Sequence, residues 1–249
     1  NDKYKMIIHN NNNNDMQILF HNLCIKYLGM FGHLSTISQA LKLFRENKWK
    51  NNYEILSIVG KYGTKDDYNK IITMITNDNQ NNQHIHNDDN FCHNNHNSHI
   101  CHNYHQDHNY ENHNREPYLK AISQTIRCEL AKENLKLLMS ENIRSQDLCF
   151  FIKYMSNNKL ITNELWETIT KNWDFFLKKF PENSTGIQQL VKTMGFGFMT
   201  SEQLQKYENF FVIRPSGTNI VIEQTIEKIS HRINIIQNLT DCIDTLHNI

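Results

Sequence analysis

The residues with the clearest capacity for chemistry are histidines that recur at every third position of one polar stretch. They are His93, His96, His99, His102, His105 and His108, with Cys92 and Cys101 among them. Imidazole and thiolate groups are good ligands for zinc, copper or nickel, so the stretch could bind such a metal in solution. A defined site also needs a fixed ligand set and supporting hydrogen bonds, which a polar loop does not supply. We therefore predict no metal site in this chain, and metal storage or sensing stays as an alternative hypothesis.

The sequence lacks the motifs that mark common enzyme classes. A catalytic zinc site of the His-Glu-x-x-His type needs a His-Glu pair on a helix, and no such pair occurs in the 249 residues. There is also no Gly-x-Ser-x-Gly, Walker or GxGxxG motif, and Gly195-Phe-Gly197 is better explained as a turn at a helix end. We predict no catalytic residue and no cofactor in this chain, and these patterns assign no substrate-binding residue.

Two kinds of residue that can be catalytic or ligand-binding are here explained more simply by packing. Cys149 lies beside Phe150 and Phe151 in an apolar stretch, where a buried and inert thiol is expected rather than a nucleophile. Trp166 and Trp173 lie seven residues apart on one helical face, which is typical of a core. All of these are therefore expected to be structural.

Two charged residues flank Ser145, the expected N-cap of a helix. Asp147 is expected to lie against the amide groups at the start of that helix. Arg144 could project into a cavity and anchor a carboxylate, but a surface ion pair is the preferred interpretation.

The composition limits the class of protein and of partner. Lys+Arg and Asp+Glu number 26 each, so no net charge attracts nucleic acid or an anionic membrane. Only 3 prolines and 8 glycines are present, which favours long helices over a β-sandwich rich in turns. No apolar run approaches the roughly 18 to 20 residues needed to cross a bilayer. We predict neither nucleic acid nor a membrane as a partner.

The cysteines and the first residue bear on the cellular compartment. The six cysteines include no CxxC pair, so a reducing compartment, and hence a cytoplasmic location, is expected. The chain starts with Asn1 rather than methionine, which predicts that it begins inside a longer protein. Any targeting segment is then expected upstream.

Apolar residues at helical spacing recur along most of the chain. Four helices are expected over about residues 15–76, with Gly63 as a left-handed C-cap and Thr64 starting the next helix. A helix from Thr162 to Pro181 and a capping box of Thr200 with Gln203 are expected further on. The last helix carries a stripe of Ile222, Ile226, Ile229, Ile233 and Ile236.

The spacing of these helices predicts the architecture. Helix pairs are expected to begin near residues 16, 51, 116, 145 and 184. This spacing predicts an all-α fold, a HEAT- or armadillo-like α-solenoid of antiparallel helix pairs. An irregular helical bundle is the alternative. The predicted domain spans 15–249 after a low-complexity lead-in at 1–14, and a disordered Asn/His-rich insert interrupts it at 77–114.

Several stretches, taken in order, resemble one known family. Ser140–Asp147 resembles the Ser-x-x-[Ile/Val]-Arg-x-Gln-Asp segment in the C-terminal domain of M1 zinc aminopeptidases. Leu165–Trp173, followed by Phe175-Phe176-Leu177, resembles the Trp…Asn-Trp helix of that domain. Phe198–Leu204 up to Phe210-Phe211 resembles its Phe-x-Thr…Phe-Phe segment, and weaker similarities occur in Leu41–Trp49 and Val59–Tyr68. The resemblance covers about residues 16–249 apart from the insert.

The resemblance implies a function for the chain. The family includes the puromycin-sensitive and endoplasmic-reticulum aminopeptidases. In it, this helical domain forms a bowl that encloses the substrate cavity, gates peptide access to the zinc and helps hold the far ends of peptides. Zinc is implied for an upstream catalytic domain outside this chain. The expected partners are a peptide substrate on the concave face and, within the same protein, the catalytic domain. The main alternative is a free-standing helical-repeat scaffold that binds a protein or peptide.

Overall fold

The described part of the chain is all-helical. The computed structural model describes residues 15–49, 52–82, 114–180 and 184–247, in which twelve α-helices and no strand occur. The helices are α1 (Asp15–Met30), α2 (Leu34–Arg45), α3 (Tyr53–Tyr62), α4 (Lys65–Asn82), α5 (Glu116–Ser123), α6 (Cys128–Leu138), α7 (Ser145–Ser156), α8 (Thr162–Lys171), α9 (Trp173–Lys178), α10 (Thr185–Met194), α11 (Ser201–Phe210) and α12 (Asn219–His247). The predicted all-α class is confirmed.

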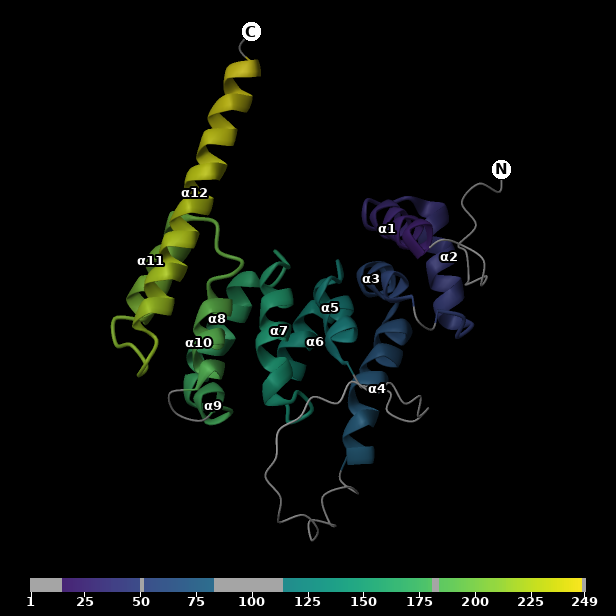
Figure 1. Cartoon of the computed structure of the whole chain (residues 1–249), viewed down its shortest axis with the longest axis horizontal. Coiled ribbons are helices and arrows are strands. Elements are labelled where there is room, and N and C mark those ends of the chain that lie inside the picture. The colour runs from purple at the N-terminus through teal and green to yellow at the C-terminus, as the bar shows by residue number, and fades with distance from the viewer. Residues whose placement is uncertain (1–14, 50–51, 83–113, 181–183, 248–249) are drawn as a thin grey trace, which may run out of the picture.

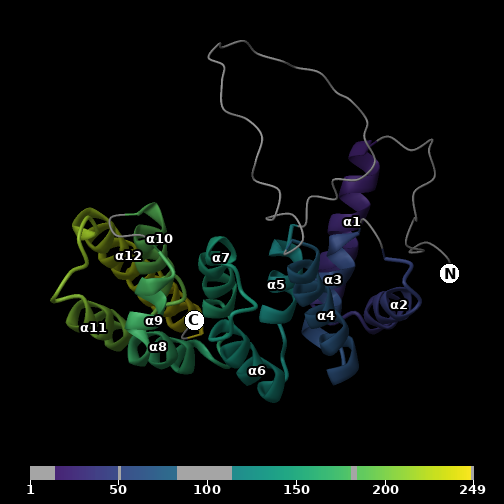
Figure 2. The same ribbon diagram turned by 90° about the horizontal axis from the view of Figure 1, so that it is seen from below.

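The helices lie in two rows (Figure 1 and Figure 2). In the first row α3 packs against α5, α5 against α7, α7 against α10, and α10 against α12, while α1 lies on α3 at one end. Helices α4, α6, α8 and α11 lie on the other side of this row in Figure 2. Most of these helices bury an apolar face against their neighbours, and the buried residues form one cluster that reaches from Ile25 on α1 to Ile233 on α12. The finer expectation of HEAT- or armadillo-like repeats stays a prediction.

Helix starts follow local hydrogen-bonding rules. The backbone N–H of Gln203 donates to Thr200 Oγ1 at 3.2 Å, and Gln203 Oε1 accepts from the Thr200 N–H, so the predicted capping box is confirmed. At the start of α4 the Thr64 N–H donates to Asp67 Oδ2 at 2.9 Å. Arg45 on α2 donates to the same carboxylate through Nε and Nη2, at 2.9 and 2.7 Å. Asp67 therefore ties the start of α4 to α2.

The expectation of a left-handed C-cap at Gly63 is wrong. Gly63 has φ −60° and ψ 162°, an extended conformation that any residue adopts. The glycine is needed for space, because a Cβ here would lie 2.4 Å from the Val59 carbonyl oxygen. Its N–H donates to that same oxygen at 2.7 Å and closes α3.

The expected single helix from Thr162 to Pro181 is also wrong. Asn172, with φ −117° and ψ 32°, ends α8 and precedes α9. Its side-chain amide donates to the Thr168 carbonyl oxygen at 2.8 Å, so it replaces a backbone hydrogen bond of the helix. The chain turns at this residue and the second helical segment begins at Trp173.

The first residues of the predicted insert at 77–114 are helical. Helix α4 includes residues 77–82 and ends at Asn82. The low content of aliphatic residues in this stretch had predicted disorder instead. A helix that is already nucleated adds residues at small cost, which offsets their poor propensity. Residues 83–113 and the lead-in at 1–14 lie outside the described residues, and so does the histidine stretch.

Candidate functional site

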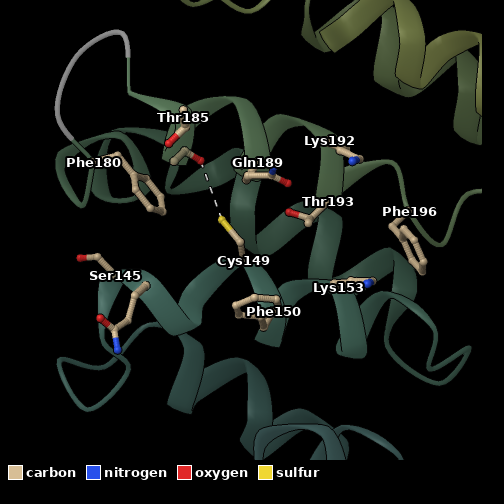
Figure 3. Close-up of a pocket in the computed structure, with 12 residues that line it drawn as sticks. Ser145, Cys149, Phe150, Lys153, Phe180, Thr185, Gln189, Lys192, Thr193 and Phe196 are labelled. Atoms are coloured by element: carbon tan, nitrogen blue, oxygen red, sulfur yellow. Dashed lines mark hydrogen bonds between the residues drawn. The ribbon is translucent and has the colours of Figure 1, made fainter. Parts of the chain in front are cut away.

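A cavity of about 450 Å³ lies between α7 and α10, two neighbouring helices of the first row (Figure 3). It is lined by Ser145, Gln146, Cys149, Phe150 and Lys153 of α7, by Thr185, Gly186, Gln189, Lys192 and Thr193 of α10, and by Phe180 and Phe196. On each helix these positions recur at helical spacing and share one face. The volume falls within the roughly 300–1,000 Å³ of small-ligand sites. We call this cavity the α7–α10 pocket.

Three phenylalanines give the pocket an apolar wall. Phe150 belongs to α7, while Phe180 and Phe196 lie just outside helices α9 and α10. Phe150 is 45% exposed and Phe196 is 37% exposed, although large apolar side chains elsewhere in the same helices are buried in the core. An apolar wall with a few polar groups is the usual composition of a ligand site.

Two lysines supply the charge of the pocket. Figure 3 shows Lys153 of α7 and Lys192 of α10 on the same side, next to Phe196. The Lys153 ammonium lies 5.3 Å from the centre of the Phe196 ring, a cation–π contact. These lysines carry the only formal charges among the described residues that line the pocket. The pocket therefore suits an anionic group such as a carboxylate, with an apolar portion against the aromatic wall.

Cys149 lies in the wall of this pocket. Its Sγ lies 3.8 Å from the Gly186 carbonyl oxygen, to which the thiol donates (Figure 3). Burial raises the pKa of the Cys149 thiol to about 11, so the thiol is protonated near neutral pH. The expectation of an inert thiol agrees with this geometry, although the side chain is half-buried rather than fully buried.

The charged residues at the start of α7 form an ion pair. Arg144 Nε donates to Asp147 Oδ2 at 2.6 Å, and Asp147 is buried. The predicted ion pair of Arg144 is present, but its partner Asp147 is buried rather than at the surface, and Arg144 does not line the pocket. Ser145 is the first residue of α7 rather than its N-cap, which is Arg144. Helix boundaries inferred from sequence are commonly shifted by one residue.

The two tryptophans belong to an aromatic cluster that joins α8 and α9 to α11. The Trp166 ring lies 5.1 Å from Phe198 and 5.5 Å from Phe210, and the Trp173 ring lies 5.4 Å from Phe210 and 5.9 Å from Phe211, measured between ring centres. These distances are typical of packed aromatic pairs. Both tryptophans pack in this cluster as expected, but the expectation that they share one helical face is wrong, because Trp166 lies on α8 and Trp173 begins α9.

Tyr207 connects this aromatic cluster to the pocket helix. Its ring lies 6.0 Å from Trp166, and its hydroxyl donates to the Val191 carbonyl oxygen of α10 at 3.0 Å. Burial raises the pKa of Tyr207, so this hydroxyl stays a donor at any physiological pH. The aromatic cluster therefore fixes α10 from behind, on the side away from the pocket.

The described residues offer no metal centre. They contain no group of three or more His, Cys, Asp or Glu side chains placed to hold an ion. The zinc that the sequence resemblance implies therefore does not fit these residues. The histidine stretch and its cysteines lie outside the described residues, so the prediction of no metal site there stays a prediction.

Sequence reasoning missed the residues that form the pocket. Lys153, Gln189, Lys192 and Phe196 carry no motif, and only their helical spacing relative to one another hints at a shared face. That spacing becomes informative only once α7 and α10 are known to be neighbours, and this pairing is a tertiary fact.

None of the described helices is both long and apolar enough to cross a membrane.

Comparison with known proteins identifies relatives. Residues 99–231, a little more than half of the 249, match the family described as the ERAP1-like C-terminal domain. The chain is 30% identical to human glutamyl aminopeptidase over 104 residues, which are 41% of this chain and 11% of that protein. It is 27% identical to the pig glutamyl aminopeptidase over 132 residues, 52% of this chain and 14% of that protein. It is 32% identical to aminopeptidase A of Gloydius brevicauda over 75 residues, 30% of this chain and 8% of that protein.

These alignments span about a tenth of the length of each relative. The expected likeness to the puromycin-sensitive enzyme in particular stays a prediction.

Proposed function

Because the chain belongs to the family of ERAP1-like C-terminal domains found in M1 aminopeptidases, we propose that it is the non-catalytic C-terminal domain of a zinc aminopeptidase. In this proposal the helical array encloses the substrate cavity and controls peptide access to a zinc site on an upstream catalytic domain. The match over residues 99–231 is the observation that carries the proposal.

The α7–α10 pocket supports a role in holding part of the peptide. Lys153 and Lys192 can pair with a carboxylate, and the phenylalanine wall can cover an apolar side chain. Contacts made far from the reacting atoms still position a substrate, because they raise its effective concentration at the active site. The relatives are named for glutamyl residues, so acidic peptides are the class to test first.

A peptide-binding measurement tests this role. The probe is a fluorescein-labelled octapeptide with two glutamates, a C-terminal phenylalanine and a free carboxyl group, titrated with the chain and followed by anisotropy. The doubly substituted chain K153A/K192A is expected to bind roughly 5- to 30-fold more weakly, because charge-assisted hydrogen bonds contribute roughly 1 to 2 kcal/mol net at a half-open site. Lys132→Ala on α6 is the matched control, since Lys132 is exposed and does not line the pocket. Equal affinities of the double variant and the wild-type chain would contradict the pocket assignment.

An activity measurement tests the non-catalytic assignment. The purified chain is expected to release no fluorophore from aminoacyl-coumarin substrates, with or without added zinc. Release that a metal chelator abolishes would overturn the assignment.

A free-standing helical scaffold that binds a protein or peptide is the second candidate. The pocket would serve it equally well, so peptide binding does not separate the two. The reading frame upstream of residue 1 does: a His-Glu-x-x-His motif there supports the aminopeptidase, and its absence supports the scaffold.

A further inference from the structure

The Gly195-Phe196-Gly197 turn follows α10, as the sequence predicts, and supplies one wall residue of the α7–α10 pocket. Neither glycine leaves room for a side chain. A Cβ on Gly195 would lie 2.7 Å from Thr225 Cγ2 of α12. A Cβ on Gly197 would lie 1.9 Å from the Ser156 carbonyl oxygen at the end of α7. The turn is therefore wedged between α7 and α12, and Phe196 is the residue of the turn that lines the pocket.

Arg232 of α12 holds this turn without lining the pocket itself. Its Nη2 donates to the Gly195 carbonyl oxygen at 3.0 Å, and its Nη1 donates to the Phe196 carbonyl oxygen. Its Nε donates to the Lys228 carbonyl oxygen of its own helix at 3.2 Å, which orients the guanidinium group. The positive charge also lies at the C-terminal end of α10, where the helix dipole favours a cation. One side chain therefore fixes two consecutive carbonyl groups of the turn.

Apolar side chains already hold α12 in the fold. Ile222, Ile229 and Ile233 of this helix are buried in the core, and α12 packs against both α10 and α11. The hydrogen bonds of Arg232 to the turn come in addition to this packing. Their specific contribution is the position of the backbone at Phe196.

Phe196 in turn lies beside a charge of the pocket. The Lys153 ammonium is 5.3 Å from the centre of the Phe196 ring, and Figure 3 shows the two side chains next to each other. Phe196 is 37% exposed, whereas Phe198 is buried against Trp166, with 5.1 Å between the ring centres. The backbone of the turn therefore sends one aromatic ring into the core and presents the other to the pocket.

We propose that Arg232 is a positioning residue of the α7–α10 pocket, which sets the Phe196 ring for an apolar group of the ligand beside Lys153. This inference rests on the proposed role of the pocket in holding part of a peptide. A guanidinium group suits this task because its planar fork of donors can hold two acceptors at once.

Two labelled octapeptides test the proposal, titrated with the full chain and followed by anisotropy. One is the acidic peptide with a C-terminal phenylalanine, and in the other an alanine replaces that phenylalanine. Arg232→Met keeps the aliphatic stem and removes the donors. We expect it to bind the phenylalanine peptide roughly 3- to 10-fold more weakly, the range of one aromatic contact, and the alanine peptide within about 2-fold of wild type. A purely structural role would weaken the binding of both peptides alike.

Phe196→Ala shows whether Arg232 acts through the ring. In this background Arg232→Met is expected to cause no further loss of affinity for the phenylalanine peptide, because the group that it positions is gone. Arg232→Lys keeps a charged donor and is expected to recover most of the affinity. Arg214→Ala is the matched control, since Arg214 pairs with Glu223 of α12 at 2.9 Å and does not line the pocket. Circular dichroism and urea denaturation check the folding of each variant.

Three results would overturn the inference: an unchanged affinity of Arg232→Met for the phenylalanine peptide, an equal loss for both peptides, or a further loss in the Phe196→Ala background. If Arg232→Met does not fold, Phe196→Ala alone decides. A loss confined to the phenylalanine peptide then supports the inference, and wild-type affinity overturns it, because Arg232 would have nothing to position. A wild-type chain that binds neither peptide would instead overturn the proposed peptide role of the pocket, and this inference with it.

Discussion

The junctions α3–α5 and α7–α10 join neighbouring helices of the same row in two different ways. At α3–α5 a glycine lets the backbones touch: a Cβ on Gly60 would lie 1.9 Å from the Ala121 carbonyl oxygen. At α7–α10 the pocket of about 450 Å³ separates parts of the two helices. The residues at the contact, small in one case and large and partly polar in the other, decide whether stacked helices make a closed core or a binding site.

The polar groups of the two halves of the molecule differ in the same way: Asp67 joins α2 to α4 in the half that contains α3–α5, and two lysines line the pocket in the other. In the closed half, Asp67 takes hydrogen bonds from Arg45 and Thr64 and holds the start of α4. In the other half, Lys153 and Lys192 line the pocket, and the Lys153 ammonium lies over the Phe196 ring. Polar groups satisfied within the fold stabilise it, whereas groups that face a cavity are available to a ligand.

The largest effect is expected from a substitution at the α3–α5 junction, where the two backbones touch. Gly60→Ala forces a methyl group into the Ala121 backbone, so we expect it to lower the free energy of unfolding by about 3 kcal/mol, measured by urea denaturation. Gly186→Ala at the open junction is the control. Its Cβ would meet the ring of Phe180, a side chain at the pocket edge that can move, so a loss below about 1 kcal/mol is expected. Equal losses in the two variants would contradict the contrast between the junctions.

The second effect is a pH dependence of the free energy of unfolding, which is expected from Asp67 at the start of α4. Burial by itself raises the pKa of Asp67, but hydrogen bonds from Arg45 and Thr64 together outweigh it, so this pKa lies below its ordinary value. A depressed pKa in the folded state stabilises the fold above the unfolded-state pKa of about 3.9, and the stabilisation is lost as the pH falls through the folded-state value.

Asp67→Asn is therefore expected to cost about 2 kcal/mol of unfolding free energy between pH 5 and 8. The difference from wild type should shrink below about pH 4, as urea titrations at several pH values would reveal. A cost that is independent of pH down to pH 2 would argue against the ionised anchor.

The smallest effect is expected in the labelling rate of Cys149, whose thiol lies in the wall of the α7–α10 pocket. Because burial raises the pKa of Cys149 to about 11, the thiolate fraction near pH 8 is small and iodoacetamide should modify this thiol at least about tenfold more slowly than exposed Cys128. The rate at Cys149 should rise with pH up to about 11, as peptide mass spectrometry can follow. Labelling of the two cysteines at similar rates at pH 8 would mean that the pocket wall is more open than the structure indicates.

The sequence predicts the parts of the fold that depend on neighbours along the chain. Apolar stripes at helical spacing locate the helices, and the Thr200–Gln203 pattern gives a cap that the structure confirms. The break at Asn172 was missed because asparagine is tolerated within helices, and only its hydrogen bond to Thr168 shows that it interrupts one here. Gly63 was misread because glycine after a helix usually signals a left-handed residue, whereas here it serves close contact.

The candidate site was beyond prediction for a different reason. Cys149 and Phe150 were interpreted from their apolar surroundings, but Lys192 and Gln189 lie about 40 residues away on another helix. No local rule brings those two faces together, because that depends on how α7 and α10 stack. The motifs that revealed the family, such as Trp166 and Phe210, proved to be packing residues on the far side of α10 rather than parts of the pocket.

Hydrogen–deuterium exchange with and without the acidic octapeptide tests the central claim most directly, because it compares both junctions in one experiment. If the peptide binds in the α7–α10 pocket, exchange is expected to slow in α7 and α10, over residues 145–156 and 185–194, and to stay unchanged in α3 and α5. Protection confined to α3 and α5, or none in α7 and α10 at saturating peptide, would contradict it.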